Sequence, residues 1–202
     1  MPVVYGGGLE EIAEKLRKTS DEVINLHSAP DYTVAAVGFS PGFPYLLGLP
    51  EELRVPRLAT PRHVEAGSVA IANDQAGIYP FASQGGWSVL GRTGLRLFDP
   101  QRGEPSLFRP GDKVRFSPVS SMKSQEPGKP KLRLPAGGIE VLESGAFTTV
   151  QDLGRHGFQH LGVSPGGAAD PVAARVANRL LGNPDDAALL ECCLSGPILK
   201  FR

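Results

Sequence analysis

The residues with the clearest chemical potential are polar side chains set within apolar, glycine-rich stretches. They occur in both halves of the chain: Arg62, Gln75, Tyr79, Gln84 and Arg92, then Gln151, Asp152, Arg155, Asp170 and Asn178. Neither set contains an activated nucleophile or a metal motif, so a site built from them would act by positioning and electrostatics. Phosphoryl or carboxyl transfer suits such a site.

Residues 38–42 (GFSPG) and 162–166 (GVSPG) match the Gly-x-Ser-x-Gly elbow of serine esterases. In an elbow, the backbone N–H of the residue after the serine helps to form the oxyanion hole. Here that residue is proline, which has no N–H. We therefore interpret both segments as tight turns that bring the backbone near a ligand, and their recurrence suggests that the two halves are built alike.

Residues 86–93 (GWSVLGRT) differ from a phosphate-binding loop by an arginine at the lysine position. Such a loop follows a strand and opens a helix, whereas residues 87–90 are strand-like and no helix is expected after them. The alternative left open is that Arg92 alone holds a phosphate or carboxylate through two hydrogen bonds.

His156 and His160 are four residues apart, a spacing that would bring both side chains to a zinc ion only if they lay on a helix. Gly154 and Gly157 make a helix unlikely here. We predict no metal site. The two cysteines, Cys192 and Cys193, are neighbours and therefore poorly placed to form a disulfide with each other. Free thiols fit a reducing cytoplasm.

The chain has 202 residues, with 21 basic and 21 acidic side chains and a formal net charge of zero. This balance argues against nucleic acid or an anionic membrane as a partner. No apolar run approaches the roughly 20 residues that span a bilayer, so we expect a cytoplasmic location. The 25 glycines and 19 prolines, with 41% hydrophobic residues, favour many short strands around a real core.

The elements expected in the first part are two short helices followed by strands. Apolar periodicity and capping residues predict helices at residues 9–16 and 21–26. From residue 32 to residue 116, short apolar runs recur about every ten residues, which is typical of a small sandwich or barrel. The expected strands are residues 34–37, 68–71, 87–90, 95–98 and 114–116.

A segment rich in Pro, Lys and Ser then predicts a linker. Strands are expected after it at residues 139–142 and 147–150, and a hairpin from residues 189–194 and 198–201. Asp170, Pro171 and Gly182 delimit a helix between them. Its expected buried stripe is Val172, Val176, Ala177 and Leu180.

Many motifs of the first part resemble the B subunit of bacterial ATP-dependent 5-oxoprolinase, also called the kinase-inhibitor or allophanate hydrolase subunit 1 family. They are GFSPGFPYL (38–46), TPR (60–62), AGSVAIA (66–72), GIYP (77–80), GGW (85–87), GRT (91–93), LFDP (97–100) and PGD (110–112). The later motifs resemble the start of the C subunit, the allophanate hydrolase subunit 2 family. They are TTVQDLGR (148–155), GVSPGGAAD (162–170) and NRLLGN (178–183).

The resemblance implies a mainly β fold of two cyclophilin-like barrels, related to the carboxyltransferase domain of urea carboxylase. The domain like the B subunit would span residues 1–118, without the family's N-terminal α+β domain, and the linker would span 119–137. Residues 138–202 would form an incomplete barrel like that of the C subunit. The sequence departs from the family's GGQT at Asn73-Asp74-Gln75-Ala76, which affects ligand contacts expected near Gln75.

The resemblance also implies ATP-dependent cleavage of 5-oxoproline to glutamate, with Mg²⁺ accompanying ATP. The implied partners are the A subunit of 5-oxoprolinase, the rest of the module related to the C subunit, a small amide substrate and a second copy of the chain. The implied catalytic residues are Gln151, Asp152 and Arg155. The implied substrate- or ATP-binding residues are Arg62, Gln75, Tyr79, Arg92, Gly166 and Gly167. We expect these 202 residues to be inactive alone.

Two alternatives belong to other functional classes. One is a binding protein that inhibits a sensor histidine kinase. The other is the carboxyltransferase component of a biotin-dependent, urea amidolyase-like enzyme. The second would need a biotin carrier from a partner, because Met122-Lys123 is followed by Ser124 and not by the second methionine of the biotin signature.

Overall fold

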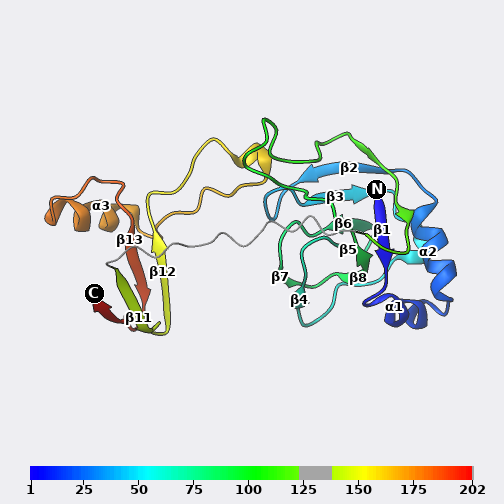
Figure 1. Ribbon diagram of the computed structural model, residues 1–202, viewed down its shortest axis with the longest axis horizontal. Helices are drawn as coiled ribbons and strands as arrows, with labels where there is room; N and C mark the ends of the chain where they lie inside the picture. The colour runs from blue at the N-terminus through cyan, green and yellow to red at the C-terminus, as the bar shows by residue number, and fades with distance from the viewer. Residues whose placement is uncertain (123–137, 202) are drawn as a thin grey trace. The chain divides into compact units, whose positions relative to one another are not determined.

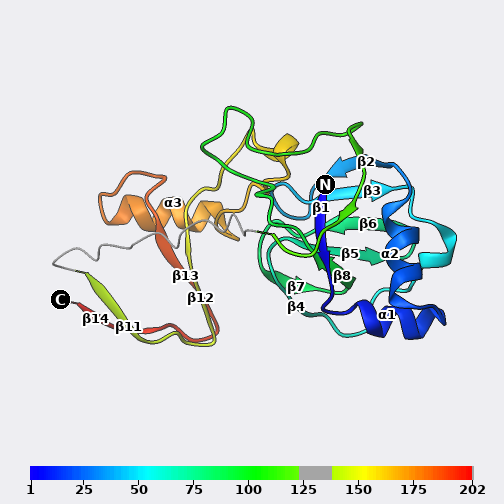
Figure 2. The same cartoon turned by 45° about the vertical axis from the view of Figure 1, so that its right-hand side comes forward.

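A computed structural model of the protein describes residues 1–122 and 138–201. Most of the predicted linker, 119–137, therefore lies outside the described residues. The described chain is mainly β, as predicted, and forms two compact units (Figures 1 and 2). One comprises residues 1–122 with 160–163, and the other comprises residues 138–159 with 164–201.

The first unit begins with β1 (Pro2–Tyr5), α1 (Leu9–Leu16) and α2 (Ser20–Ser28). Its later elements are β2 (Tyr32–Val37), β3 (Pro44–Leu47), η1 (Glu51–Leu53), β4 (Arg62–Val64), β5 (Ser68–Ala72), β6 (Gln75–Ile78), β7 (Ser83–Gly85), β8 (Ser88–Arg92), β9 (Lys113–Val114) and β10 (Ser117–Pro118). The predicted strand at residues 95–98 is wrong: this stretch makes only an isolated bridge, between Phe98 and Ser106.

Eight of these strands form one sheet in the order β10-β1-β8-β5-β6-β3-β2-β9. Only β1 and β10 are parallel neighbours; the other pairs are antiparallel. The two edge strands are consecutive in sequence, and three residue steps cannot span more than about 11 Å. The sheet must therefore curl until its edges approach each other, which produces the expected barrel-like shape.

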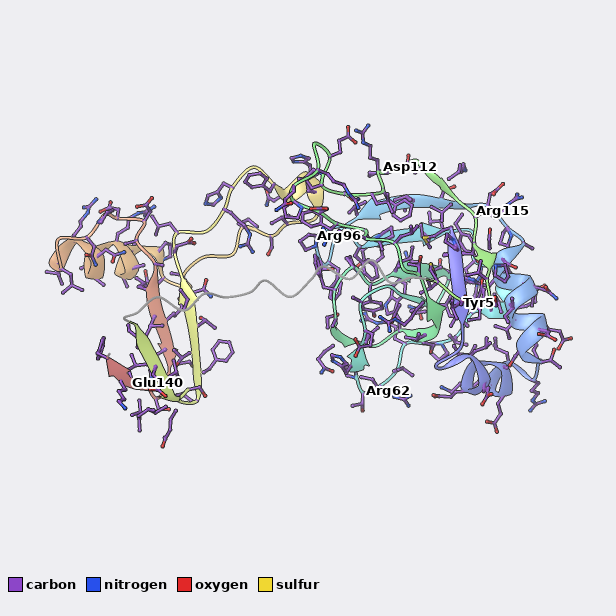
Figure 3. All side chains as sticks on the ribbon, in the orientation of Figure 1. Tyr5, Arg62, Arg96, Asp112, Arg115 and Glu140 are labelled. Atoms are coloured by element: carbon purple, nitrogen blue, oxygen red, sulfur yellow. The ribbon has the colours of Figure 1, made fainter. Side chains whose placement is uncertain are left out.

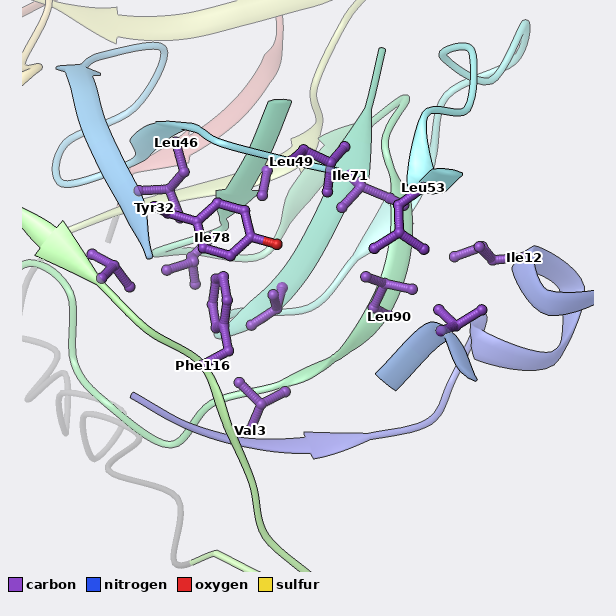
Figure 4. Close-up of a cluster of buried hydrophobic side chains, with 14 of the residues drawn as sticks. Val3, Ile12, Tyr32, Leu46, Leu49, Leu53, Ile71, Ile78, Leu90 and Phe116 are labelled. Atoms are coloured by element: carbon purple, nitrogen blue, oxygen red, sulfur yellow. The ribbon is translucent and has the colours of Figure 1, made fainter. Parts of the chain in front are cut away.

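The curled sheet is packed on both faces. The inner cluster includes Tyr32, Ile71, Leu90 and Phe116 (Figure 4), and the residues Leu9, Ile12 and Ala13 of α1 join it. A second cluster lies on the other face: Phe43, Val64, Ala70, Ala72, Tyr79 and Trp87. Val69 and Ile71 of β5 enter the first cluster and Ala70 and Ala72 enter the second, as the alternation of a strand requires, and Ser68 is buried as well.

Both predicted N-terminal helices are confirmed. α2 starts with a capping box, in which Thr19 Oγ1 accepts the Glu22 backbone N–H at 3.2 Å and Glu22 Oε2 accepts the Thr19 N–H at 2.7 Å. This reciprocal pair satisfies donors that the first turn of a helix leaves open.

His27 of α2 is fully buried. Its Nδ1 lies 2.7 Å from Tyr5 Oη, and its ring stacks on Phe116 with centroids 4.3 Å apart. Nε2 has no hydrogen-bond partner among the described residues. Burial lowers the pKa of His27 from 6.5 to about 3, because the imidazolium would lose its hydration.

This burial predicts a pH-dependent stability. Between pH 6.5 and about pH 3, the unfolded chain binds a proton that folded His27 excludes. The free energy of unfolding should therefore fall by about 1.4 kcal/mol per pH unit as the pH falls through this window. Urea unfolding at about pH 7 and about pH 5 measures the effect. His27→Phe keeps an aromatic ring against Phe116 and should remove this contribution, whereas His63→Gln, at an exposed histidine, should keep it. An unchanged pH dependence in His27→Phe would contradict the assignment.

The second unit contains four strands, a helix and a short helical turn among its described residues. They are β11 (Ile139–Glu143), β12 (Phe147–Gln151), η2 (Gln159–Leu161, shared with the first unit), α3 (Pro171–Leu180), β13 (Leu189–Cys193) and β14 (Ile198–Phe201). The predicted hairpin of the last two strands is wrong. β13 pairs with β12 and β14 pairs with β11, both antiparallel, so each finds its partner about 40 to 60 residues earlier in the chain.

The limits of α3 are confirmed, but its predicted buried stripe is wrong. Asp170 Oδ1 accepts the N–H groups of Val172 and Ala173 at 3.0 and 2.9 Å. The buried positions are Ala174 and Asn178, whereas Val172, Val176 and Leu180 are 66%, 51% and 82% exposed. Asn178 Nδ2 donates to the Ala187 carbonyl at 2.9 Å, which fixes the segment after the helix. Helical periodicity locates an apolar face, but other elements decide whether that face is covered.

Candidate functional site

One cavity of the first unit is lined by a predicted site residue and by parts of β1, β4 and β8. It has a volume of about 550 Å³ and is bordered by residues 6–8, the end of β4, β8 and Met122. Arg92, predicted to bind substrate or ATP, lines it together with His63 and Glu65. Arg92 Nη2 donates to the Ala66 carbonyl at 3.0 Å, and His63 Nε2 lies 3.0 Å from Glu65 Oε1.

Close backbone packing shapes this cavity. A Cβ on Gly8 would lie 2.7 Å from the Val89 carbonyl oxygen, and a Cβ on Gly91 would lie 2.5 Å from the Val4 carbonyl oxygen. Glycine is thus required at both positions for β1 and the following segment to approach β8. Gly7, with φ of +71°, has only Val89 Cγ1 near its Cβ position, at 3.9 Å, so its backbone faces open space.

A second, smaller cavity of about 230 Å³ shares residues 7, 8, 63, 64 and 89 with the first. Arg62, labelled in Figure 3, lines it and donates from Nη1 to Glu11 Oε2 at 3.0 Å. Lys15 also donates to Glu11, at 2.8 Å. Hydrogen bonds from Lys15 and then Arg62 lower the pKa of Glu11, so this carboxylate is ionised beside Arg62. The structure therefore brings the predicted residues Arg62 and Arg92 to adjoining cavities.

Gln75 and Tyr79 do not line these cavities. Gln75 opens β6, opposite Ala72 and Leu47. Tyr79 is buried against Phe43, and burial raises its pKa. A Cβ on Gly85 would lie 2.4 Å from Tyr79 Oη, so Tyr79 packs closely against β7 at this glycine. Direct ligand contacts for Gln75 and Tyr79 stay predictions.

The two Ser-Pro-Gly segments have different settings. Residues 38–42 connect β2 to β3, with Phe39 at a φ of +67° and Phe43 N–H donating to the Ser40 carbonyl at 3.0 Å. This confirms a tight turn. The second segment lies in the long connection between β12 and α3.

The segment that resembles a phosphate-binding loop is a strand. Ser88–Arg92 forms β8, which pairs with a strand on each side. This excludes a phosphate-binding loop that leads into a helix.

In the second unit, the predicted catalytic and glycine positions do lie together. Asp152 Oδ1 accepts the Gly154 N–H at 2.7 Å, and the Asp152 carbonyl accepts the Ala168 N–H at 2.9 Å. Arg155 N–H donates to the Pro165 carbonyl at 2.8 Å. These bonds fasten residues 152–155 alongside residues 165–168, which include Gly166 and Gly167.

The side chains of this second cluster are accessible. Asp152 and Arg155 are exposed and Gln151 is half-buried. Gln151 Nε2 donates to Thr149 Oγ1 at 3.1 Å. A Cβ on Gly154 would lie 2.7 Å from the Gly166 carbonyl oxygen, so the two loops touch through backbone. An accessible carboxylate and guanidinium held on such a backbone frame could bind charged groups of a substrate.

Sequence reasoning missed His63, Glu65 and residues 6–8 as parts of the first-unit site. His63 has no other metal-ligating or catalytic residue type at a recognisable spacing in the sequence, so nothing indicated a functional role for it. Residues Arg62–Val64 are too short and too polar to indicate β4 by their pattern, and nothing local shows that this segment borders the same cavity as β8. Across residues 1–122 and 138–201, no group of three His, Cys, Asp or Glu side chains is arranged to hold a metal ion.

Both units match the same class of domain. Residues 1–108 match the family model for the carboxyltransferase domain, subdomain C and D, and residues 161–202 match the model for subdomain A and B. The first match covers over half of the chain, so this protein belongs to the carboxyltransferase domain, subdomain C and D, family. The predicted relationship to a carboxyltransferase domain is confirmed.

Comparison with individual proteins shows which members of this class the chain resembles. The chain is 52% identical over 123 residues to the B subunit of 5-oxoprolinase from Escherichia coli O157:H7, a match covering 58% of this chain and 56% of that protein. It is 44% identical over 64 residues to the C subunit of 5-oxoprolinase from Escherichia coli K12, covering 32% and 21% respectively. The predicted resemblance to both proteins is thus confirmed. This chain spans about half the length of the B-subunit relatives that it matches.

The fold is shared with a solved structure. The crystal structure of TTHA0988 is 42% identical and superposes with a TM-score of 0.75, covering 99% of this chain and 42% of that one. The predicted mainly β fold is confirmed by this likeness and by the curled sheet itself.

Proposed function

We propose that this chain is a component of an ATP-dependent 5-oxoprolinase, which cleaves 5-oxoproline to glutamate together with a separate A subunit. The observation that carries the proposal lies within one polypeptide. One segment is 52% identical to the B subunit of 5-oxoprolinase, and another is 44% identical to its C subunit.

The chemistry needs activation of an unreactive amide. Transfer of the γ-phosphoryl group of ATP to the lactam oxygen gives ADP and makes the ring carbon a better electrophile. One water then adds to that carbon, and the C–N bond breaks with protonation of the nitrogen, which gives an acyl phosphate. A second water hydrolyses the acyl phosphate to the glutamate carboxylate and free phosphate. Catalysis of such a sequence depends on positioning and on neutralising phosphoryl charge.

The proposed roles in catalysis fall to the cluster of the second unit. Arg155 neutralises phosphoryl charge, Gln151 hydrogen-bonds the amide, and backbone N–H groups at Gly166 and Gly167 bind oxygens. Asp152 holds a proton or the Mg²⁺ that accompanies ATP. Mg²⁺ bound with phosphates needs only one or two protein carboxylates, and the exposed Asp152 side chain meets that requirement.

The predicted partners of the second unit also follow from its surface. Phe147, Val150 and Leu180 are 64%, 70% and 82% exposed, and large exposed apolar side chains in such numbers support a missing covering element. We propose that the rest of a module related to the C subunit covers these side chains. A second copy of the chain and the A subunit of the enzyme are further proposed partners.

No helix of the described chain is both long and apolar enough to cross a membrane. We propose the cytoplasm as the location, because the substrate ATP is present there and because Cys192 and Cys193 are exposed free thiols.

The proposed function is tested by ATP hydrolysis in the full-length protein mixed with its A subunit. Addition of 5-oxoproline should raise ADP release at least about tenfold, with glutamate formed in equal amount. L-Proline, which lacks the lactam carbonyl, is the matched control. The absence of stimulation above either component alone would contradict the proposal.

The family model favours a second candidate, a carboxyltransferase component. Such a protein would transfer carboxylate from carboxybiotin to an amide, and would need a biotin carboxylase and a biotin carrier. Avidin separates the two: it would abolish biotin-dependent transfer and leave 5-oxoproline-dependent ATP hydrolysis unchanged.

A further inference from the structure

We infer that Met122 is a site of reversible oxidation. Conversion of its thioether to a sulfoxide releases residues 119–122, here called the strap, from the wall of the 550 Å³ cavity in the first unit. The inference does not depend on the proposed function. Its basis is the hydrogen bond between Met122 Sδ and the backbone N–H of Gly94, two residues that both line this cavity.

The strap is fastened at both ends. At its start, the Val119 N–H donates to the Val3 carbonyl at 2.9 Å, which continues the parallel pairing of β10 with β1. At its end, Met122 Sδ accepts the Gly94 N–H at 3.0 Å. The two serines between these points are exposed. The hydrogen bond to the thioether therefore fastens the end of the strap to the cavity wall.

The donor of this hydrogen bond is held in place by its own neighbours. Thr93 is buried, and its N–H donates to the Gly67 carbonyl at 2.8 Å. A Cβ on Gly67 would lie only 2.3 Å from the Thr93 carbonyl oxygen, so the two backbone segments are in close contact. Because residues 93 and 94 are fixed in this way, the strap, and not the Gly94 N–H, moves when the sulfur changes.

Oxidation removes the acceptor. With hydrogen peroxide as the oxidant, a lone pair on Sδ attacks one peroxide oxygen and the O–O bond breaks. The departing hydroxide takes the proton left on the transferred oxygen and becomes water. Sulfur is thus oxidised by two electrons and peroxide is reduced by two. A thioether sulfur is already a weak acceptor, and the positively polarised sulfur of a sulfoxide accepts no N–H. The side chain also becomes polar and favours water.

Met122 is accessible for this reaction and has an internal comparison. Its side chain is half-buried, so peroxide can reach the sulfur from solvent. The chain has two methionines. The other, Met1, packs against the inner apolar cluster, and its ammonium group donates to the Arg115 carbonyl. Methionine sulfoxide is reduced back to methionine by dedicated reductases, so the release of the strap is reversible.

The test measures amide hydrogen exchange in the full-length protein after brief treatment with hydrogen peroxide. Dithiothreitol is then added, because it reverses disulfides and sulfenic acids at Cys192 and Cys193 but leaves a sulfoxide intact. Mass spectrometry of peptides should show one added oxygen on Met122. Exchange at the Gly94 amide should become about tenfold faster, and exchange in β5 and β6 should be unchanged. Treatment with methionine sulfoxide reductase should restore slow exchange.

Met122→Leu is the matched variant. Leucine has a similar volume and is apolar, but it neither accepts an N–H nor reacts with peroxide. Exchange at Gly94 should be fast in this variant before treatment, and peroxide should not change it, although Met1 is still present.

Four results would overturn the inference. They are slow exchange at Gly94 in untreated Met122→Leu, a peroxide effect at Gly94 that persists in that variant, unchanged exchange at Gly94 once Met122 is oxidised, and resistance of Met122 to peroxide under conditions that oxidise Met1.

Discussion

Replacing Asp152 by asparagine should lower 5-oxoproline-dependent ATP hydrolysis by about 100-fold or more. Asp152 Oδ1 accepts the Gly154 N–H at 2.7 Å, and an asparagine oxygen can accept the same bond. The loop geometry should therefore persist while the negative charge and the proton acceptor are lost. Activity is measured with the partner A subunit present, and a circular dichroism melt checks that the fold is retained.

Asp170→Asn is the matched control. Asp170 also uses its carboxylate to accept backbone N–H groups, at the start of α3, and asparagine is an equally good N-cap. This variant should keep its activity. If both variants lose activity equally, or if Asp152→Asn remains fully active, the catalytic role of Asp152 is wrong.

The second large effect is expected on the exposed face of α3. Leu180→Glu should change the free energy of unfolding of the 202-residue chain by no more than about 0.5 kcal/mol, because Leu180 is 82% exposed. In the complete protein, where the rest of the module related to the C subunit is proposed to cover this face, the buried glutamate should weaken that packing by about 2–5 kcal/mol. Amide hydrogen exchange in β12 and β13 should then be at least about 30-fold faster than in the unmodified complete protein.

Arg175→Glu places the same side chain on the same helix, away from the apolar face, and should leave exchange in both strands nearly unchanged. Equal exchange in the complete Leu180→Glu and unmodified proteins would show that this face stays open to solvent. The proposed covering of α3 would then be wrong.

The candidate site could be predicted in part. Arg62 and Arg92 were singled out as polar residues within apolar, glycine-rich stretches and through the family resemblance, and the structure places them at adjoining cavities. Gln75 and Tyr79 have the same kind of sequence signal, yet Tyr79 belongs to the aromatic cluster with Phe43. A polar residue that completes a core and one that faces a ligand look alike in sequence, because the difference is set by residues distant along the chain.

The amino-acid sequence alone determined the features that depend on a few neighbouring residues. Thr19 and Glu22 close a capping box within one helical turn, Asp170 caps α3, and a proline after the serine rules out an elbow oxyanion hole. Such features need no distant contact, because the covalent chemistry and local hydrogen bonds act within about four residues.

Only the tertiary structure decided which strands pair and which surfaces become site or core. β13 and β14 could have paired with each other, but each adds to a strand far earlier in the chain. Likewise, Arg92 donates a hydrogen bond to the Ala66 carbonyl, and the Ala168 N–H donates to the Asp152 carbonyl. Strand edges offer the same N–H and C=O groups to any partner, so the choice follows from the burial of whole faces, which no short window of sequence contains.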